Sequence, residues 1–128
     1  MQFESSRIKG KNRGKFLGFP TINLKIPKNF QLEDGIYAAF VKINDENFKG
    51  ALHFGPVPTF NEPKKSLEVF LIDVRDKNIP ELEEAVISVS IVKRLREVKK
   101  FTTNKDLILQ MQADVTKAKN ILNRYQST

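Results

Sequence analysis

Residues 10–23 carry the clearest chemical signal in the sequence. The segment reads GKNRGKFLGFPTIN, and its glycines and cations describe a loop whose backbone could approach a polyphosphate closely. It is not the P-loop pattern, because no Gly-Lys-Ser/Thr opens a helix. Thr21 and Asn23 alternate along an expected strand and point the same way, so their oxygens suit a hydrated Mg²⁺ beside phosphate. The other interpretation is an ordinary turn, after which Thr21 simply begins a strand.

Glu68 is a second candidate, because it interrupts an apolar strand. Residues 67–72 read LEVFLI and are apolar on both strand faces apart from this carboxylate. Beside Phe70 the carboxylate would be partly desolvated, which raises its pKa and suits a general base. A salt-bridged Glu at the rim of a barrel is an equally good interpretation of the sequence alone.

Short strands are the elements expected to position these residues. Apolar runs separated by Gly, Pro and Asn turns predict strands at about 21–26, 36–43, 48–54, 67–73 and 85–93, with a sixth within 4–10. Such short strands favour a small closed antiparallel barrel over about residues 4–95.

The last quarter of the chain has a helical period instead. Its apolar residues recur at spacings of three and four, at Leu107, Met111, Val115, Ala118, Leu122 and Tyr125. Thr103 is the expected N-cap, and Asp106 suits the first turn. We therefore expect one mainly β domain over residues 1–128, with a C-terminal helix over about 103–125 whose apolar stripe packs on the barrel.

The composition excludes several classes of protein. The 128 residues are 40% hydrophobic, which suffices for one core, and no apolar run is long enough to span a bilayer. The chain has no cysteine and a single histidine, His53. This composition excludes thiol catalysis and metal sites built on cysteines or on a pair of histidines. With no apolar signal segment at the start, we expect a soluble cytoplasmic protein. The net charge of +7 concentrates in residues 1–30 and 93–105, which favours an anionic partner such as a nucleotide phosphate or nucleic acid.

These segments, taken in order, resemble the riboflavin kinase (flavokinase) family. Residues 10–23 resemble the family signature GxxRGRxLGFPTxN. Four shorter matches follow: DGIYA at 34–38 with DGVYA, GPVPTF at 55–60 with GxxPTF, LEVFLID at 67–73 with LEVHLLD, and residues 95–101 with LRxExxF. In the helix, Leu107, Gln110 and Asp114 stand in family-like positions, so the resemblance extends over about residues 8–122.

The resemblance implies a fold and a reaction. The fold is a six-stranded antiparallel Greek-key barrel with a C-terminal helix packed on it. The reaction transfers the γ-phosphoryl group of ATP to the 5′-hydroxyl of riboflavin and forms FMN, with Mg²⁺ as cofactor. The expected ligands are therefore riboflavin or FMN and ATP or ADP.

The family motifs also imply roles for individual residues. Glu68 matches the catalytic base. Arg96 and Phe101 belong to a mobile flap near the flavin and the phosphates. The nucleotide is expected to bind at Gly14, Lys15, Thr21 and Asn23, of which Thr21 and Asn23 also bind the metal.

Departures from the family pattern keep other functions open. A Tyr-Gly pair usually follows the catalytic-base strand, whereas this chain has Asn78-Ile79-Pro80, and His53 stands where Asn is usual. One alternative is thus a flavin- or nucleotide-binding module with weakened catalysis. A basic nucleic-acid-binding barrel is less favoured, because the chain has no Trp and most Phe lie in expected core strands.

Bacterial members of the family usually carry an N-terminal FMN adenylyltransferase domain. Residues 1–128 contain no such segment, so the sequence fits either a stand-alone kinase or the C-terminal part of a longer enzyme.

Overall fold

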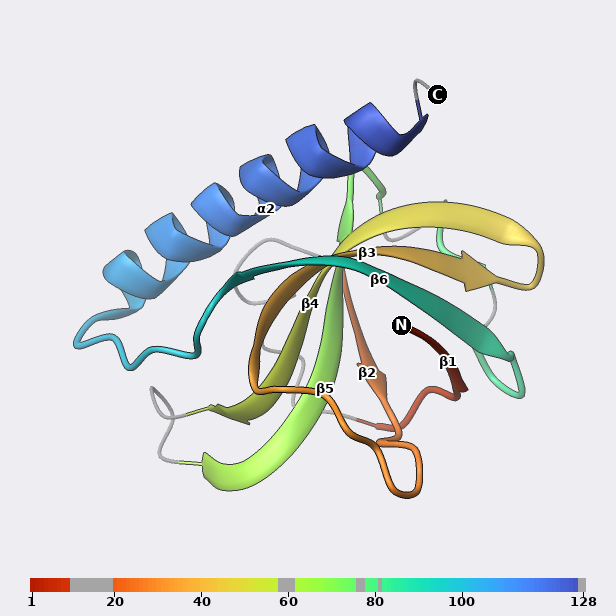
Figure 1. Ribbon diagram of the computed structural model, residues 1–128, viewed down its shortest axis with the longest axis horizontal. Coiled ribbons are helices and arrows are strands. Elements are labelled where there is room, and N and C mark those ends of the chain that lie inside the picture. Colours follow the sequence, from red (N-terminus) through yellow and green to blue (C-terminus); the bar gives the residue numbers. More distant parts are fainter. Residues whose placement is uncertain (10–19, 58–61, 76–77, 81, 127–128) are drawn as a thin grey trace.

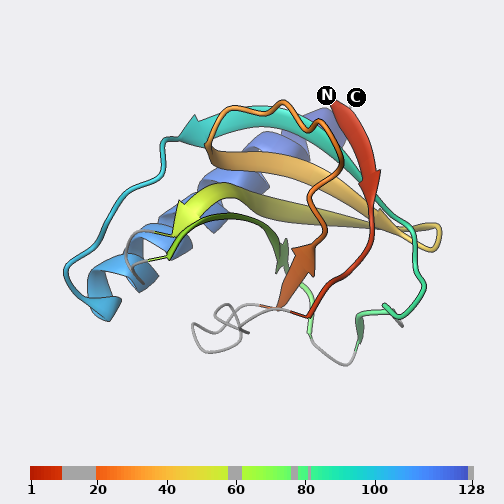
Figure 2. The ribbon, with the colours of Figure 1, turned by 90° about the horizontal axis from the view of Figure 1, so that it is seen from below.

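The computed structural model describes residues 1–9, 20–57, 62–75, 78–80 and 82–126. Its strands form a six-stranded antiparallel sheet in the order β1-β6-β3-β4-β5-β2. The elements are β1 (Gln2–Ser5), β2 (Thr21–Leu24), β3 (Gly35–Ile43), β4 (Glu46–Val57), β5 (Glu62–Ile72), β6 (Ile87–Arg96) and α2 (Asn104–Gln126). The sheet curls into a half-barrel, and α2 lies across its outer side (Figures 1 and 2). The predicted fold class is therefore confirmed.

The segment after β1 ties the two edges of the sheet together. β1 pairs with β6, and the chain then reaches the opposite edge, where the amide of Ile8 donates to the carbonyl of Asn23 at 2.8 Å. The amide of Lys25 likewise donates to the carbonyl of Ser6 at 2.9 Å. On its other side β2 pairs with β5, so β2 is hydrogen-bonded along both flanks. This fixes the strand that carries Thr21 and Asn23.

Strand alternation divides the side chains between the inside of the half-barrel and its outer side. In β5, Leu67, Val69 and Leu71 are each 1% exposed or less and belong to the inner core. The same core takes in further large side chains: Ile22, Leu24, Val41, Ile43, Leu52, Ile87 and Val89. Since successive strand residues face opposite ways, Glu68 and Phe70 lie on the outer side.

α2 covers part of that outer side. Ala118 and Leu122 of the helix are fully buried and form one apolar cluster with the sheet residues Ala38, Ala51 and Ile72. The small alanines let the helix approach the sheet closely, and this packing confirms the predicted helix contact.

The two ends of α2 differ in how well the sequence predicted them. The hydroxyl of Thr103 accepts a hydrogen bond from the amide of Asp106 at 3.1 Å, which confirms the predicted N-cap. At the other end, Tyr125 is 59% exposed, so the prediction that it packs on the sheet is wrong. The helix continues to Gln126, about one turn beyond Leu122, the last fully buried side chain, and Ile121 packs on the sheet as well.

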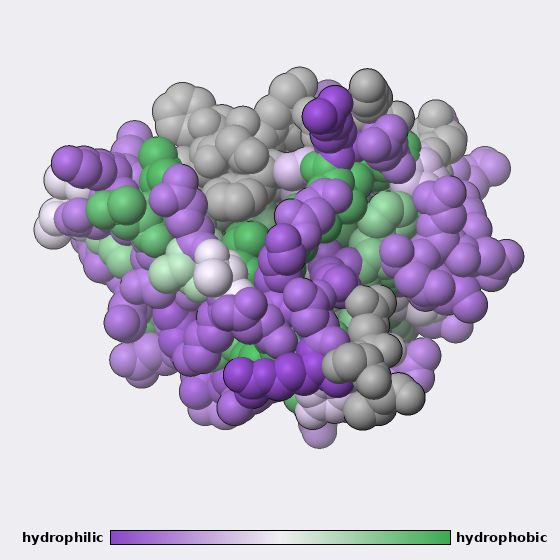
Figure 3. All heavy atoms as spheres, turned by 90° about the horizontal axis from the view of Figure 1, so that it is seen from above, coloured by the Kyte–Doolittle hydropathy of each residue, from purple (hydrophilic) through white to green (hydrophobic). Residues whose placement is uncertain are grey.

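The surface seen from above is mainly hydrophilic, and its apolar residues lie in small separate groups (Figure 3). Within the part of the chain that the structure describes, no helix is long and apolar enough to cross a membrane.

Candidate functional site

Strand pairing brings three of the predicted site residues together on the outer side of the sheet. Asn23 of β2 lies directly opposite Glu68 of β5, and Thr21 lies opposite Phe70. Residues directly opposite in an antiparallel pair share a face, with Cβ atoms about 5 Å apart. The hydroxyl of Thr21, the amide of Asn23 and the carboxylate of Glu68 therefore line one continuous surface.

Glu68 is buried at the centre of this surface. The residue is 6% exposed, and on the strand to its other side it faces His53, which is 8% exposed. His53 Nε2 lies 3.1 Å from the carbonyl oxygen of Pro56, so Nε2 carries the hydrogen and donates it. In the neutral ring Nδ1 is then an acceptor. Glu68 thus lies between an amide side chain and an imidazole, inside the sheet and away from its rim.

An apolar cluster adjoins Glu68 on the same face. Phe70, two residues further along β5, packs with Leu107 and Met111 from the first turns of α2 and with Phe101 from the connection before the helix. Leu107 and Met111 are buried, whereas Phe70 and Phe101 are half-buried. The outer side therefore offers an oxygen-rich end at β2 and an apolar end beneath α2, with Glu68 next to both.

Arg96 lies on the same face, at the end of β6. It pairs with Ile36, which pairs with His53, so three strand spacings of about 4.8 Å separate Arg96 from Glu68, roughly 14 Å in all. Its guanidinium is bound by Asp114 of α2, and the guanidinium carbon lies 5.8 Å from the centre of the Phe101 ring. Arg96 and Phe101, the two predicted flavin-side residues, are thus neighbours.

The oxygen donors at β2 fit a magnesium ion. Thr21 supplies a hydroxyl and Asn23 an amide oxygen, both half-buried on one face. Mg²⁺ prefers oxygen ligands and usually keeps several waters or phosphate oxygens, so two protein donors suffice when a nucleotide supplies the others. Across the described ranges, no three His, Cys, Asp or Glu side chains gather into a metal site. Gly14 and Lys15 lie outside the described residues.

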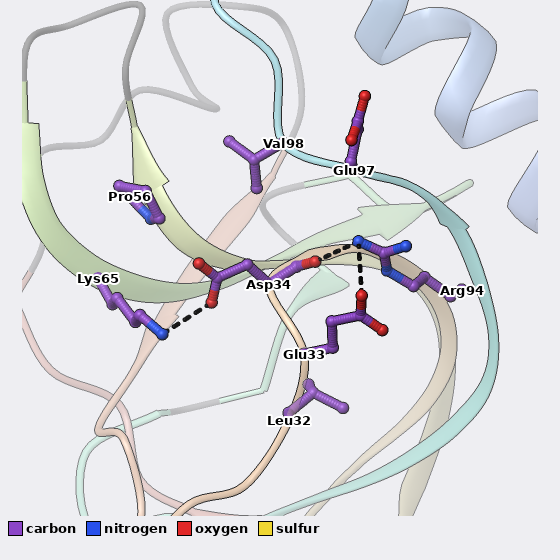
Figure 4. Close-up of a pocket in the computed structure, with 8 residues that line it drawn as sticks. All are labelled: Leu32, Glu33, Asp34, Pro56, Lys65, Arg94, Glu97 and Val98. Carbon is purple, nitrogen blue, oxygen red and sulfur yellow. Dashed lines mark hydrogen bonds and ion pairs between the residues drawn. The ribbon is translucent and has the colours of Figure 1, made fainter.

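A pocket of about 570 Å³ opens at the start of the connection after β6, and none of the individually predicted site residues lines it (Figure 4). It is lined by Leu32, Glu33, Asp34, Pro56, Lys65, Arg94, Glu97 and Val98. Lys65 Nζ lies 2.9 Å from Asp34 Oδ1, and Arg94 Nη2 lies 3.6 Å from Glu33 Oε1, so the cations of the pocket are paired with its own carboxylates. With no surplus of positive charge, this pocket does not suit a triphosphate.

Comparison with known proteins identifies the family. The model of the flavokinase family, described as riboflavin kinase, matches residues 1–122. The chain belongs to the riboflavin kinase family. It is 33% identical over 115 residues to a bifunctional riboflavin kinase/FMN adenylyltransferase from Bacillus subtilis, covering 87% of this chain and 35% of that protein.

A further relative and one solved structure extend the comparison. The RNA-binding riboflavin kinase RibR of Bacillus subtilis is 31% identical over 110 residues, covering 85% of this chain and 46% of that protein. The chain thus spans less than half the length of these relatives. A crystal structure described as a macrolide-efflux protein from Streptococcus pneumoniae superposes with a TM-score of 0.77 at 24% identity, over 93% of this chain and 38% of that one. At that identity the similarity concerns the fold.

In this riboflavin kinase family member, sequence reasoning missed two neighbours of the predicted site. The first is His53 opposite Glu68, because cross-strand register is not visible in a single strand. The second is Asp114 as the partner of Arg96. The sequence did hold a signal for it, since Asp114 lies between Met111 and Ala118 on the buried side of the helix, where an ion needs a partner.

Proposed function

We propose that the chain is a riboflavin kinase, which transfers the γ-phosphoryl group of ATP to the 5′-hydroxyl of riboflavin to form FMN and ADP in the cytoplasm. The observation that supports this most is the outer surface on which Asn23 and Glu68 face each other next to the apolar cluster around Phe70. The polar side chains of β2 suit the phosphates of ATP with their metal ion, and the Glu68 carboxylate suits the hydroxyl that is phosphorylated. The apolar cluster suits the flat flavin ring. Riboflavin and ATP together present these groups in that order.

The proposed chemistry needs one proton acceptor and firm alignment. The 5′-hydroxyl oxygen attacks the γ-phosphorus as Glu68 takes the hydroxyl proton, and the bond between the γ-phosphorus and the bridging oxygen breaks with ADP as leaving group. Thr21 and Asn23 would hold Mg²⁺, which when bound neutralises the charge on the phosphates. Gly14 and Lys15 complete the proposed nucleotide site as a phosphate-binding loop, in which Lys15 contributes a point charge.

The flavin ring is proposed to lie near Phe101 and Arg96. Phe101 is half-buried against Leu107 and Met111, so part of its ring remains available to an aromatic ligand. Arg96 stands beside that ring. A ring bound there would point its ribityl chain toward Glu68, along the roughly 14 Å between Arg96 and the carboxylate.

The decisive experiment incubates the protein with riboflavin and ATP, with and without Mg²⁺, and separates the flavins by chromatography. We expect FMN only with Mg²⁺, and quenching of riboflavin fluorescence that strengthens when Mg-ADP is present. Riboflavin binding without any FMN would indicate instead a binding module with weakened catalysis, the alternative suggested by Asn78-Ile79-Pro80. RNA binding with a steep salt dependence and no flavin binding would contradict both.

In the relatives that are bifunctional by name, riboflavin kinase is joined to FMN adenylyltransferase. An FMN adenylyltransferase domain is therefore the proposed partner for FMN made by this chain.

A further inference from the structure

A buried ion pair joins the end of β6 to the middle of α2. Arg96 Nε donates to Asp114 Oδ1 at 2.9 Å and Oδ2 at 3.1 Å, and Arg96 Nη2 donates to Oδ2 at 2.7 Å. Gln110, one helical turn earlier, donates from Nε2 to Asp114 Oδ1 at 3.1 Å. The side chains of Arg96 and Asp114 are 14% and 8% exposed. We call Arg96, Asp114 and Gln110 the clasp.

Attachment of the helix does not by itself explain the clasp. Ala118, Ile121 and Leu122 already bind α2 to the sheet through apolar contacts. A buried ion pair adds little net stability compared with an apolar contact of the same size, because both charges must be desolvated. What a bidentate carboxylate does provide is a fixed plane for the guanidinium. The clasp therefore sets a geometry.

That geometry extends into the connection between β6 and α2. Arg96 Nη1 donates to the carbonyl of Glu97 at 2.9 Å, so the guanidinium also fixes the first residue of the connection. The guanidinium carbon lies 5.8 Å from the centre of the Phe101 ring, within range of a cation–π contact. Phe101 is in turn part of the apolar cluster beside Glu68.

We propose that Asp114 and Gln110 are positioning residues for the flavin site: by orienting Arg96 they hold Phe101 and the connection of residues 97–103 in place for the isoalloxazine ring. This inference rests on the proposed function, since it assumes that riboflavin binds on the Glu68 face. It assigns a role to two helix residues that do not themselves contact the substrate. ATP, bound at the β2 end, should not depend on the clasp.

Asp114→Asn is the main test, because it keeps the size of the side chain and removes its charge. We expect the KM for riboflavin to rise about tenfold or more, as for the loss of a charge-assisted hydrogen bond, and the KM for ATP to stay within about twofold. Gln110→Ala leaves the ion pair in place and should raise the riboflavin KM only about threefold. Should Asp114→Asn fail to fold, Arg96→Lys keeps the charge, loses the fork geometry, and should show the same selective rise.

The matched control is Asp73→Asn. Asp73 Oδ2 lies 2.6 Å from Lys119 Nζ of the same helix, but this pair is exposed and belongs to neither proposed ligand site. Asp73→Asn should leave the KM for riboflavin and the KM for ATP unchanged. A lower melting temperature for Asp114→Asn together with an unchanged riboflavin KM would overturn the inference, and so would an equal rise in the KM for ATP.

A double variant tests whether the clasp acts through Phe101. If it does, adding Asp114→Asn to Phe101→Leu should raise the riboflavin KM by no more than about twofold further. If the fold-changes of the two single variants multiply in the double variant, the clasp does not act through Phe101 and the inference is overturned. Failure of the proposed function is recognised separately, since the unaltered protein would then form no FMN. In that case the same comparisons are made on the riboflavin Kd from fluorescence quenching, and a Kd unaffected by Asp114→Asn would equally contradict the clasp.

Discussion

Glu68→Gln separates a catalytic role of this carboxylate from a structural one. Glutamine keeps the volume and most of the hydrogen-bonding capacity of the side chain, but it does not accept a proton at neutral pH. Because Glu68 is 6% exposed and faces Asn23 and His53 across the strands, a change of shape there would disturb both neighbours. The substitution leaves the shape intact and removes the base.

The expected loss is large and confined to turnover. General-base catalysis is typically worth about 10²–10⁴-fold, which corresponds to roughly 3–5 kcal/mol of the activation barrier. We expect kcat for FMN formation to fall by that factor. Riboflavin affinity should stay close to that of the unaltered protein, because the apolar cluster around Phe70 is untouched. The melting temperature should stay the same or rise, since a buried carboxylate is costly to keep ionised.

The assay follows FMN by chromatography, riboflavin binding by fluorescence quenching and unfolding by thermal melting. Glu46→Gln serves as the control: it makes the same change of charge at the exposed start of β4, in the hairpin that joins β3 to β4, and should alter none of the three. Turnover of Glu68→Gln within about threefold of the unaltered protein, with a lowered melting temperature, would refute the assignment of Glu68 as general base. It would indicate instead that the charge of Glu68 stabilises the fold.

Three other predictions concern the metal end of the site and the core. Thr21→Ala should reduce kcat at least tenfold with little change in melting temperature, if its hydroxyl is worth about one charge-assisted hydrogen bond; turnover within twofold would refute the metal assignment. Asn23→Asp adds a negative charge beside the phosphates and should raise the KM for ATP more than that for riboflavin, whereas equal losses would make Asn23 structural. Burial raises the pKa of Tyr37 above its usual 10.0, with Arg94 opposing, so the unfolded chain gives up this proton at lower pH than the folded chain does. Its contribution to stability is therefore complete below about pH 10 and is lost as the pH rises toward the folded-state pKa, and Tyr37→Phe should flatten the alkaline side of a denaturation profile.

The elements were predictable from the sequence because their signals are local. Alternating apolar residues predicted the core strand around Leu67, Val69 and Leu71, and Thr103 predicted the start of the helix; burial and capping confirm both. The strand ends were less predictable: β5 begins at Glu62, before its apolar run, and Glu62 and Ser66 pair with Val57 and Gly55 at the end of β4. Pairing with a neighbouring strand lengthened β5 beyond its apolar pattern.

The arrangement of the site was only partly predictable. The sequence indicated that Thr21 and Asn23 share a face, since two residues apart on a strand they must. That Asn23 lies opposite Glu68, and Glu68 opposite His53, depends on the register of three strands, which no local pattern fixes. The partner of Arg96 was missed for a different reason: an aspartate on the buried side of the helix signals a partner, but which residue it meets is decided only when the helix packs on the sheet.

The most direct test of the proposed function follows the phosphoryl group itself. The protein is incubated with riboflavin, Mg²⁺ and ATP labelled at the γ-phosphate, and the label is traced to FMN, inorganic phosphate or unreacted ATP. We predict that labelled FMN and unlabelled ADP form in equal amounts and that neither forms without Mg²⁺. Label that appears only in inorganic phosphate, or that stays in ATP while riboflavin is bound, would contradict the assignment of this chain as a riboflavin kinase.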